Sequence, residues 1–131
     1  MKKFNFKLKV YYEDTDAQGI VYYANYLKFF DRARSEAIAS YGLSNKYLKE
    51  KYKVIIIVKS CNIHYKKSAK LEDCLDISSK VSNMTYSSFI MKQVAKKGKD
   101  IISEADVHLV VVDMEGKPTK IPDVLKKKLG N

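Results

Sequence analysis

Tryptophan is absent from this 131-residue sequence, and cysteine and proline occur only twice each. Cys61 and Cys74 form neither a CxxC pair nor a disulfide framework. The sequence therefore excludes a disulfide-rich secreted scaffold and a paired-cysteine zinc site. We expect both cysteines to be buried free thiols in a reducing compartment.

Long apolar runs are missing as well. No stretch approaches the roughly 20 apolar residues that a membrane-spanning helix needs, so we expect no integral membrane segment. The basic start, residues 1–5, is not followed by the apolar core of a signal peptide. We therefore expect a cytoplasmic protein.

Common cofactor and metal motifs are also lacking: there is no P-loop, GxGxxG or HExxH pattern. His64 and His108 are the only histidines, and neither is followed three or four residues later by a second metal ligand. The sequence thus predicts no metal site.

Acidic residues are outnumbered, since 25 Lys and Arg face 15 Asp and Glu and the net charge is +10. Arginine occurs only at Arg32 and Arg34, and the lysines are dispersed along the chain. Dispersal favours a solvated basic surface; attraction of an anionic small ligand is the next interpretation, and specific nucleic-acid binding ranks last. The densest lysine groups are Lys66-Lys67, Lys96-Lys97-Lys99 and Lys126-Lys127-Lys128.

The residues that are present indicate a globular protein. With 46% hydrophobic and 31% charged residues, the chain has the composition of a folded domain with one sizeable core. We find no repeat, low-complexity segment or linker, so residues 1–131 are interpreted as a single domain.

The first two elements have clear periodicities. Residues 4–12 begin with strict alternation of apolar and polar side chains, which predicts a half-buried strand. From residue 25 to about 41 the period changes to three and four, which predicts an amphipathic helix. Asn25 is the natural N-cap of this helix, and Gly42 is a left-handed C-cap. The apolar stripe consists of Tyr26, Phe30, Ala33, Ala37 and Tyr41, widened by Leu27, Phe29 and Ile38.

The remainder is rich in strand patterns. Ser44 is expected to cap a short helix over about 45–52, and the β-branched run 54–58 suggests a strand buried on both faces at one end. Further strands are predicted at 54–65, at 75–81 before a polar turn near 82–83, through 89–91, and at 101–111 after a hairpin turn at 97–100; a terminal helix is predicted at 122–129. Short links imply antiparallel pairing, so we predict an α+β fold with the long helix on one face of a five-stranded antiparallel sheet.

An acidic loop over residues 13–22 joins the first strand to the long helix. Gly19 is its most permissive backbone point. The loop places carboxylates close in sequence to a helix N-terminus, whose unpaired N–H groups carry partial positive charge. A carboxylate facing such donors is a plausible site for attack on a polarised carbonyl, although acidic turns near helix starts are also common for purely structural reasons.

The run YEDTDAQGIVYYANYLKFFDRARSE, residues 12–36, resembles the signature of hotdog-fold acyl-CoA thioesterases. It is most similar to the 4-hydroxybenzoyl-CoA thioesterase-like group, which includes the YbgC-type, Tol–Pal-associated enzymes. The element order resembles that hotdog fold, a sheet wrapped around a central helix, over nearly the whole chain. The resemblance implies an acyl-CoA thioesterase that needs no cofactor, since coenzyme A is part of the substrate.

The resemblance also implies roles for individual positions. Asp16 matches the catalytic carboxylate, as nucleophile or general base, and Gly19 matches the glycine of the turn. The backbone N–H of Tyr23 matches the donor that polarises the thioester carbonyl, and Asn25 and Tyr26 match the Asn-Tyr pair at the helix start. From these matches we expect Gly19, Asn25 and Tyr26 to contribute to substrate binding.

The sequence departs from the family pattern at two positions. Tyr23 stands where YbgC-type members usually have histidine, and Gln18 where glycine or alanine is usual. The missing histidine argues against an imidazole-assisted step but leaves a mechanism based on Asp16 intact. Glu13 and Asp14 are the other acidic candidates, with a solvated turn as the simpler interpretation; Asp14 could instead pair with Arg32 or Arg34.

Partners follow from the same comparison. Lys66, Lys67 and Lys70 come after the second strand, where relatives often contact the nucleotide of coenzyme A, so we expect them to bind substrate. An unpaired sheet edge predicts a homodimer or homotetramer with the site between subunits. The alternatives are a non-catalytic hotdog protein that binds acyl-CoA or an acyl carrier, and a basic module for nucleic acid or acidic lipid.

Overall fold

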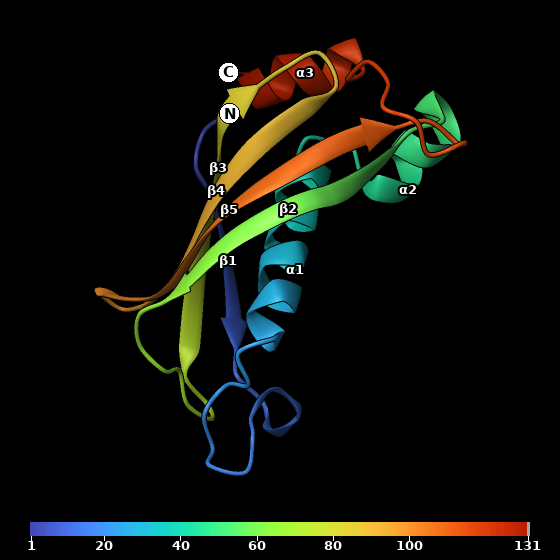
Figure 1. Ribbon diagram of the computed structural model, residues 1–131. Coiled ribbons are helices and arrows are strands. Elements are labelled where there is room, and N and C mark those ends of the chain that lie inside the picture. Colours follow the sequence, from blue (N-terminus) through green and yellow to red (C-terminus); the bar gives the residue numbers. More distant parts are fainter. Residues whose placement is uncertain (131) are drawn as a thin grey trace.

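A single antiparallel sheet curves around the long helix α1, as the computed structural model of residues 1–130 shows (Figure 1). The sheet has five strands in the order β1-β3-β4-β5-β2, so the predicted α+β fold with a five-stranded antiparallel sheet is confirmed. The strands are β1 (Phe4–Lys9), β2 (Ile55–Tyr65), β3 (Cys74–Met84), β4 (Ser88–Lys97) and β5 (Asp100–Val112). The helices are α1 (Asn25–Ala39), α2 (Asn45–Tyr47) and α3 (Asp123–Gly130), with a 3-10 turn η1 (Tyr12–Asp14) and a π-helical turn η2 (Leu48–Tyr52).

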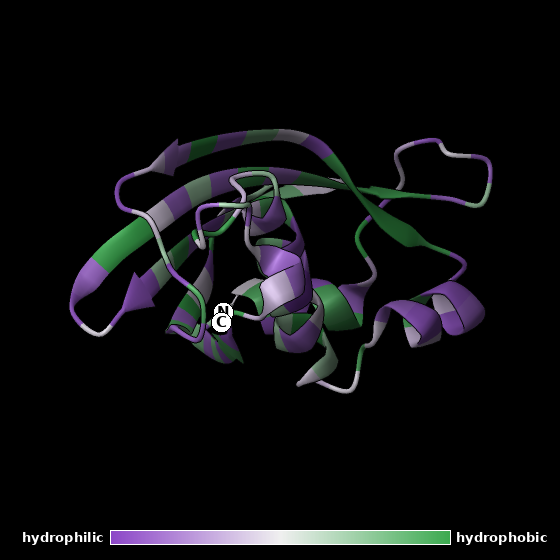
Figure 2. Ribbon diagram, turned by 90° about the horizontal axis from the view of Figure 1, so that it is seen from below, coloured by the Kyte–Doolittle hydropathy of each residue, from purple (hydrophilic) through white to green (hydrophobic). Residues whose placement is uncertain are grey.

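The core lies between α1 and the concave face of the sheet, and Figure 2 shows the sheet arching over the helix when it is seen from the loop end. Alternation along β4 buries Phe89 and Met91 in the same hydrophobic cluster as Phe29 and Phe30 of α1. Each fully buried side chain of this size contributes about 1.5–3 kcal/mol of transfer free energy, so the apolar stripe of α1 holds the helix against the sheet.

A buried polar network also fixes α1 to the sheet. Gln93 of β4 is fully buried; its Nε2 donates to the carbonyl of Phe30 at 2.9 Å and to Ser79 Oγ at 2.8 Å. Its Oε1 accepts a 3.2 Å hydrogen bond from Arg34, which also pairs with Asp31 at 3.2 Å. Burial lowers the pKa of the Arg34 guanidinium, while Asp31 acts in the opposite direction.

The first strand is shorter than predicted. β1 ends at Lys9, and the prediction of a strand through residue 12 is wrong because Tyr12–Asp14 forms the turn η1. The side chain of Asp14 accepts a 2.9 Å hydrogen bond from the Tyr11 N–H, which stabilises that turn.

The start of α1 also differs from the prediction. Ala24 occupies the N-cap position without a side-chain cap, and Asn25 is the first helical residue, so the N-cap assignment is wrong. Asn25 Nδ2 instead donates to the carbonyl of Asp14 at 2.9 Å. Gly42 has a φ of 77°, which confirms the left-handed residue after the helix. Leu27 is exposed and lies outside the apolar stripe.

Strand β2 is an edge strand, which contradicts the prediction that one of its ends is buried on both faces. Ile55, Ile57 and Val58 are 39%, 44% and 49% exposed, respectively. Only β5 pairs with β2 among residues 1–130, so the outer edge carries exposed β-branched side chains beside backbone groups without a strand partner.

The other connections are largely as predicted. The hairpin turn at Gly98 and the terminal helix α3 are confirmed, and Ser44 Oγ accepts from the Tyr47 N–H at 3.2 Å to cap α2. The turn placed near residues 82–83 is wrong, because β3 continues through a register shift to Met84. Cys61 is half-buried and Cys74 is exposed, so the prediction of two buried thiols is also wrong. No helix in the described part of the chain is long and apolar enough to cross a bilayer.

Candidate functional site

The loop between β1 and α1 forms a small hairpin of its own. Thr15 makes a β-bridge with Val21, and the N–H of Asp16 donates to the carbonyl of Ile20 at 2.9 Å. Gly19 closes the turn with a φ of 78°, a left-handed conformation that favours glycine, and its N–H donates to the Asp16 carbonyl at 3.1 Å. Asp16 therefore lies near the tip of an ordered turn.

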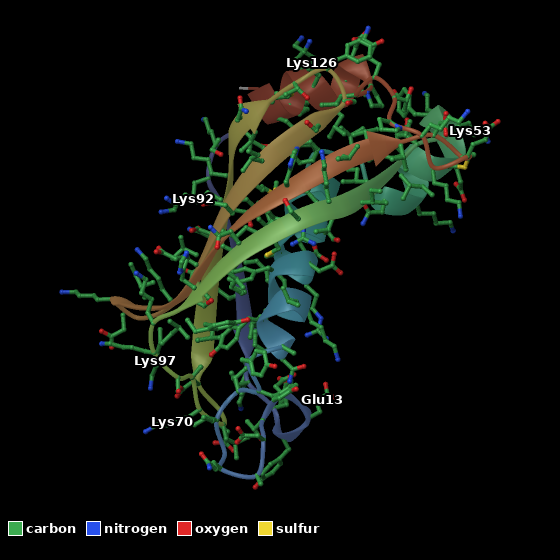
Figure 3. All side chains as sticks on the ribbon, in the orientation of Figure 1. Glu13, Lys53, Lys70, Lys92, Lys97 and Lys126 are labelled. Atoms are coloured by element: carbon green, nitrogen blue, oxygen red, sulfur yellow. The ribbon has the colours of Figure 1, made fainter. Side chains whose placement is uncertain are left out.

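A second loop, between β2 and β3, pairs with this hairpin. The Val21 N–H donates to the Ala69 carbonyl at 2.9 Å, and the Leu71 N–H donates to the Gly19 carbonyl at 3.1 Å. Ile20 and Lys70 form a β-bridge between these contacts. The structure thus brings Gly19 and Lys70 together, at the same end of the molecule as Glu13 (Figure 3).

The side chain of Asp16 is accessible in this loop. It is exposed, and its Oδ1 accepts a 2.8 Å hydrogen bond from the Gln18 N–H. Within residues 1–130, no hydrogen bond joins the Asp16 carboxylate to the Tyr23 amide. Asp16 is therefore an exposed carboxylate whose Oδ2 has no hydrogen-bond donor among residues 1–130, and no hydrogen bond of the described chain joins its side chain to α1.

The front of α1 offers unpaired backbone donors. The Tyr22 N–H donates to the Asp14 carbonyl at 3.0 Å, and the Asn25 N–H donates to the Tyr22 carbonyl at 2.8 Å. Between them, the amides of Tyr23 and Ala24 have no acceptor among residues 1–130. Such donors at the positive end of a helix can polarise a carbonyl and stabilise an oxyanion. The sequence pointed to Tyr23 but not to the Ala24 amide.

Asp14 has a structural role that distinguishes it from Asp16. It is only 8% exposed, its carboxylate accepts from the Tyr11 N–H, and its carbonyl accepts from both Tyr22 and Asn25. No arginine pairs with it in the described part of the chain. The interpretation of Asp14 as a solvated turn residue is therefore wrong, whereas Glu13 is exposed as expected.

Aromatic side chains line the junction between the two loops and α1. Tyr26 is 3% exposed, and its hydroxyl accepts a 3.4 Å hydrogen bond from the Ala69 N–H. Burial raises the pKa of Tyr26, so its hydroxyl stays protonated at neutral pH. The ring of Tyr65, at the end of β2, contacts the rings of Tyr26 and Tyr23. Sequence reasoning did not single out Tyr65, because strand periodicity does not report which side chains meet across the fold.

The three predicted substrate-binding lysines have different surroundings. Lys66 pairs with Glu104 at 3.4 Å and Lys67 with Asp100 at 3.1 Å, so both lie along β5. Lys70, by contrast, has no carboxylate within ion-pair distance among residues 1–130 and stands beside the hairpin that carries Asp16. Of the three, Lys70 is best placed to meet an anion at this loop.

The Asp73 side chain connects the second loop, between β2 and β3, to Lys97 at the end of β4. Burial opposes its ionisation, but hydrogen bonds from the Lys70 N–H at 2.8 Å and from Lys97, at 3.0 Å, together lower the pKa of Asp73. Within residues 1–130, no three His, Cys, Asp or Glu side chains gather in a way that could hold a metal ion.

Comparison with known proteins gives the family. The profile of the thioesterase-like superfamily matches residues 10–129. The acyl-CoA thioesterase YbgC of Haemophilus influenzae is 36% identical over 124 residues, which cover 94% of this chain and 91% of that protein. The acyl-CoA thioester hydrolase YbgC of Escherichia coli is 34% identical over 121 residues, 91% of this chain and 90% of that protein.

Solved structures of similar proteins support the same fold. A probable thioesterase from Bartonella henselae superposes with a TM-score of 0.89 at 31% identity, covering 92% of this chain and all of that one (100%). A 1,4-dihydroxy-2-naphthoyl-CoA thioesterase from Synechocystis has a TM-score of 0.91 at 19% identity, covering 99% of this chain and 97% of that one, a likeness of fold. The predicted hotdog fold is thereby confirmed, and the chain belongs to the thioesterase-like superfamily.

Proposed function

We propose that this protein hydrolyses an acyl-CoA thioester to a carboxylate and free coenzyme A. The observation that carries the proposal is the match with YbgC acyl-CoA thioesterases over nearly the whole chain, at 36% identity. The local geometry supports it, because an accessible carboxylate on an ordered turn and unpaired helix amides occur at one end of the fold.

Asp16 supplies the carboxylate in this proposal. Thioester hydrolysis needs a group that attacks the carbonyl carbon or deprotonates the attacking water, and a donor set for the developing oxyanion. In the first route Asp16 forms a mixed anhydride as coenzyme A leaves, and water then hydrolyses it. In the second route Asp16 takes a proton from water as the water oxygen attacks the carbonyl carbon, the C–S bond then breaks, and coenzyme A leaves as the thiol with that proton.

The amide of Tyr23 supplies the oxyanion contact, with that of Ala24 beside it. Both N–H groups are unpaired among residues 1–130 and stand at the positive end of a 15-residue helix. This role needs no imidazole, so tyrosine at position 23 is compatible with it. Asn25 and Tyr26 hold the helix front to the two loops through Asp14 and Ala69.

We propose further that the site is completed by a second copy of the chain. In the single chain, Asp16 is exposed and the exposed apolar edge of β2 has no strand partner among residues 1–130. Pairing of β2 with β2 of a second copy would cover Ile57 and Val58 and extend the sheet. A dimer, alone or within a tetramer, would thus place the Asp16 loop at a subunit boundary.

Substrate attraction is electrostatic in part. The phosphates of coenzyme A favour lysines, and Lys70 is the lysine beside the Asp16 hairpin that has no ion-pair partner among residues 1–130. Lys66 and Lys67 would have to exchange their carboxylate partners for phosphate to take part.

The test is release of free thiol from short-chain, long-chain and aryl acyl-CoAs, followed with a colorimetric thiol reagent. Turnover of at least one substrate class is expected. Binding of acyl-CoA without thiol release would instead identify a non-catalytic acyl-CoA-binding protein. Neither binding nor release, with salt-sensitive binding of random DNA, would identify a basic nucleic-acid module.

A further inference from the structure

Tyr65 is the last residue of β2, and the residues directly before and after it in the sequence are both hydrogen-bonded to β5. It pairs in register with Ser103, whose Oγ donates to the carbonyl of His64 at 2.9 Å. The next residue, Lys66, donates its N–H to the Ile102 carbonyl at 2.8 Å. The base of the Tyr65 side chain is therefore part of the sheet and not of a mobile loop.

The ring of Tyr65 contacts two other tyrosine rings. Its centroid is 5.6 Å from that of Tyr26 and 5.9 Å from that of Tyr23, and the pair with Tyr23 is edge-to-face at 82°. Tyr26 is a rigid support, since it is buried, packs edge-to-face on Phe29 at 5.8 Å, and accepts a hydrogen bond from the Ala69 N–H.

Tyr23 lies in a turn whose backbone is held by hydrogen bonds from the Tyr22 N–H to the Asp14 carbonyl and from the Asn25 N–H to the Tyr22 carbonyl, but its ring has few other contacts. Its side chain is 61% exposed, and its second ring contact is Tyr22, at 5.0 Å, which is itself 47% exposed and belongs to the same turn. Of the two ring partners, only Tyr65 connects Tyr23 to the sheet. The Tyr65 ring is therefore the aromatic contact that links this turn to the sheet, in addition to the backbone hydrogen bonds of the turn.

We propose that Tyr65 is a positioning residue, whose edge-to-face contact with Tyr23 holds the turn at the front of α1, and with it the Tyr23 amide, in one orientation. The proposal rests on the proposed function, in which that amide contacts the oxyanion. An oxyanion donor works only when its orientation is fixed before the reaction, so loss of the ring lowers kcat. An edge-to-face aromatic pair shifts an equilibrium by roughly two- to tenfold, which sets the expected size of the effect.

The kinetic test compares three variants at position 65. Tyr65→Phe keeps the ring and is expected to retain the kcat of the unchanged protein, whereas Tyr65→Ala is expected to lose roughly two- to tenfold in kcat with little change in KM. Tyr65→Leu removes the ring but keeps an apolar side chain larger than alanine, and it repeats the test if the alanine variant does not fold. Tyr47→Ala is the matched control, because Tyr47 is similarly exposed and makes an edge-to-face pair with Tyr52 at 6.2 Å and 76° on the α2–η2 segment.

The second readout does not depend on activity. Hydrogen–deuterium exchange of a peptide covering residues 22–27 is expected to be faster in Tyr65→Ala and Tyr65→Leu than in Tyr65→Phe and Tyr47→Ala. An unchanged exchange rate overturns the proposal. So does a Tyr65→Ala effect confined to KM that varies with the acyl group, because the ring would then be a substrate contact. If the unchanged protein releases no thiol, the proposed function fails, and the exchange result still decides whether Tyr65 holds the turn.

Discussion

The side-chain amide of Asn25, the first residue of α1, donates a 2.9 Å hydrogen bond to the backbone carbonyl of Asp14. The Tyr22 N–H donates to the same carbonyl at 3.0 Å. These two bonds fix the helix front relative to the loop that carries Asp16. The asparagine thus links the two halves of the proposed site, although it does not cap the helix.

Removing this link should loosen the site more than it destabilises the fold. Asn25→Ala is expected to lower the free energy of unfolding by about 1 kcal/mol, the usual net value of one hydrogen bond, and to lower kcat. Chemical denaturation and steady-state kinetics measure the two effects. Asn45→Ala, which removes the exposed 3.2 Å contact of Asn45 with Ser35, is the control and should leave kcat unchanged. Equal kcat values for Asn25→Ala and the control would contradict this role.

The buried network around Gln93 predicts a large loss of stability. Gln93→Leu leaves the Arg34 guanidinium, the Ser79 hydroxyl and the Phe30 carbonyl without their partner, and is expected to cost about 2–4 kcal/mol of unfolding free energy. Adding Arg34→Met removes the buried guanidinium that has lost its Gln93 acceptor, so the double variant should be more stable than Gln93→Leu alone. Additive losses in urea denaturation would show that the two side chains do not interact.

The lowered pKa of Asp73 predicts a pH-dependent contribution to stability. A carboxylate with a folded pKa below its ordinary value of 3.8 stabilises the fold above that pH, and the contribution is lost as the pH falls through the folded pKa. Asp73→Asn should therefore be less stable than the unchanged protein by about 1 kcal/mol at neutral pH. The unfolding free energies of the two proteins should converge as the pH falls from 3.8 through the folded pKa of Asp73.

The control for this prediction is Asp100→Asn, which breaks the exposed ion pair with Lys67. An exposed pair of this kind contributes between about 0 and 1 kcal/mol, so the change should be small at every pH. A stability difference for Asp73→Asn that is independent of pH would contradict an electrostatic origin.

The exposed edge of β2 predicts self-association. The unchanged protein should have at least twice the 15.1 kDa mass of one chain in light scattering. Ile57→Asp places a charge on that edge and should yield monomers with reduced turnover. Tyr86→Asp changes a side chain that is 68% exposed on the β3–β4 turn and should leave the mass unchanged. A monomeric unchanged protein would exclude a site shared between subunits.

Local sequence patterns were sufficient to predict many of the helices and turns of the fold. The long helix, the hairpin at Gly98 and the terminal helix follow from periodicity, turn chemistry and a proline directly before the helix, all of which act over a few neighbouring residues. Strand order is not local. The apolar run at the start of β2 has the same pattern whether it is buried in the middle of a sheet or exposed at its edge, so its exposure could not be predicted.

The same limit applies to the site. Asp14 and Asp16 are equivalent by spacing, and only the hydrogen bonds distinguish the buried Asp14 from the presented Asp16. Arg34 is a charge within an apolar stripe, and its partner Gln93 lies on a distant strand. The Tyr65–Tyr23 contact likewise depends on how β2 passes the front of α1.

The central claim is that the Asp16 carboxylate performs the chemistry. The most direct test is kcat/KM for thiol release from the best acyl-CoA substrate by Asp16→Asn, compared with Glu13→Gln, an exposed acid in the same loop. Asp16→Asn should lose about 10²–10⁴-fold with an unchanged circular dichroism spectrum, and Glu13→Gln should keep its activity. Undiminished turnover by folded Asp16→Asn would contradict the account.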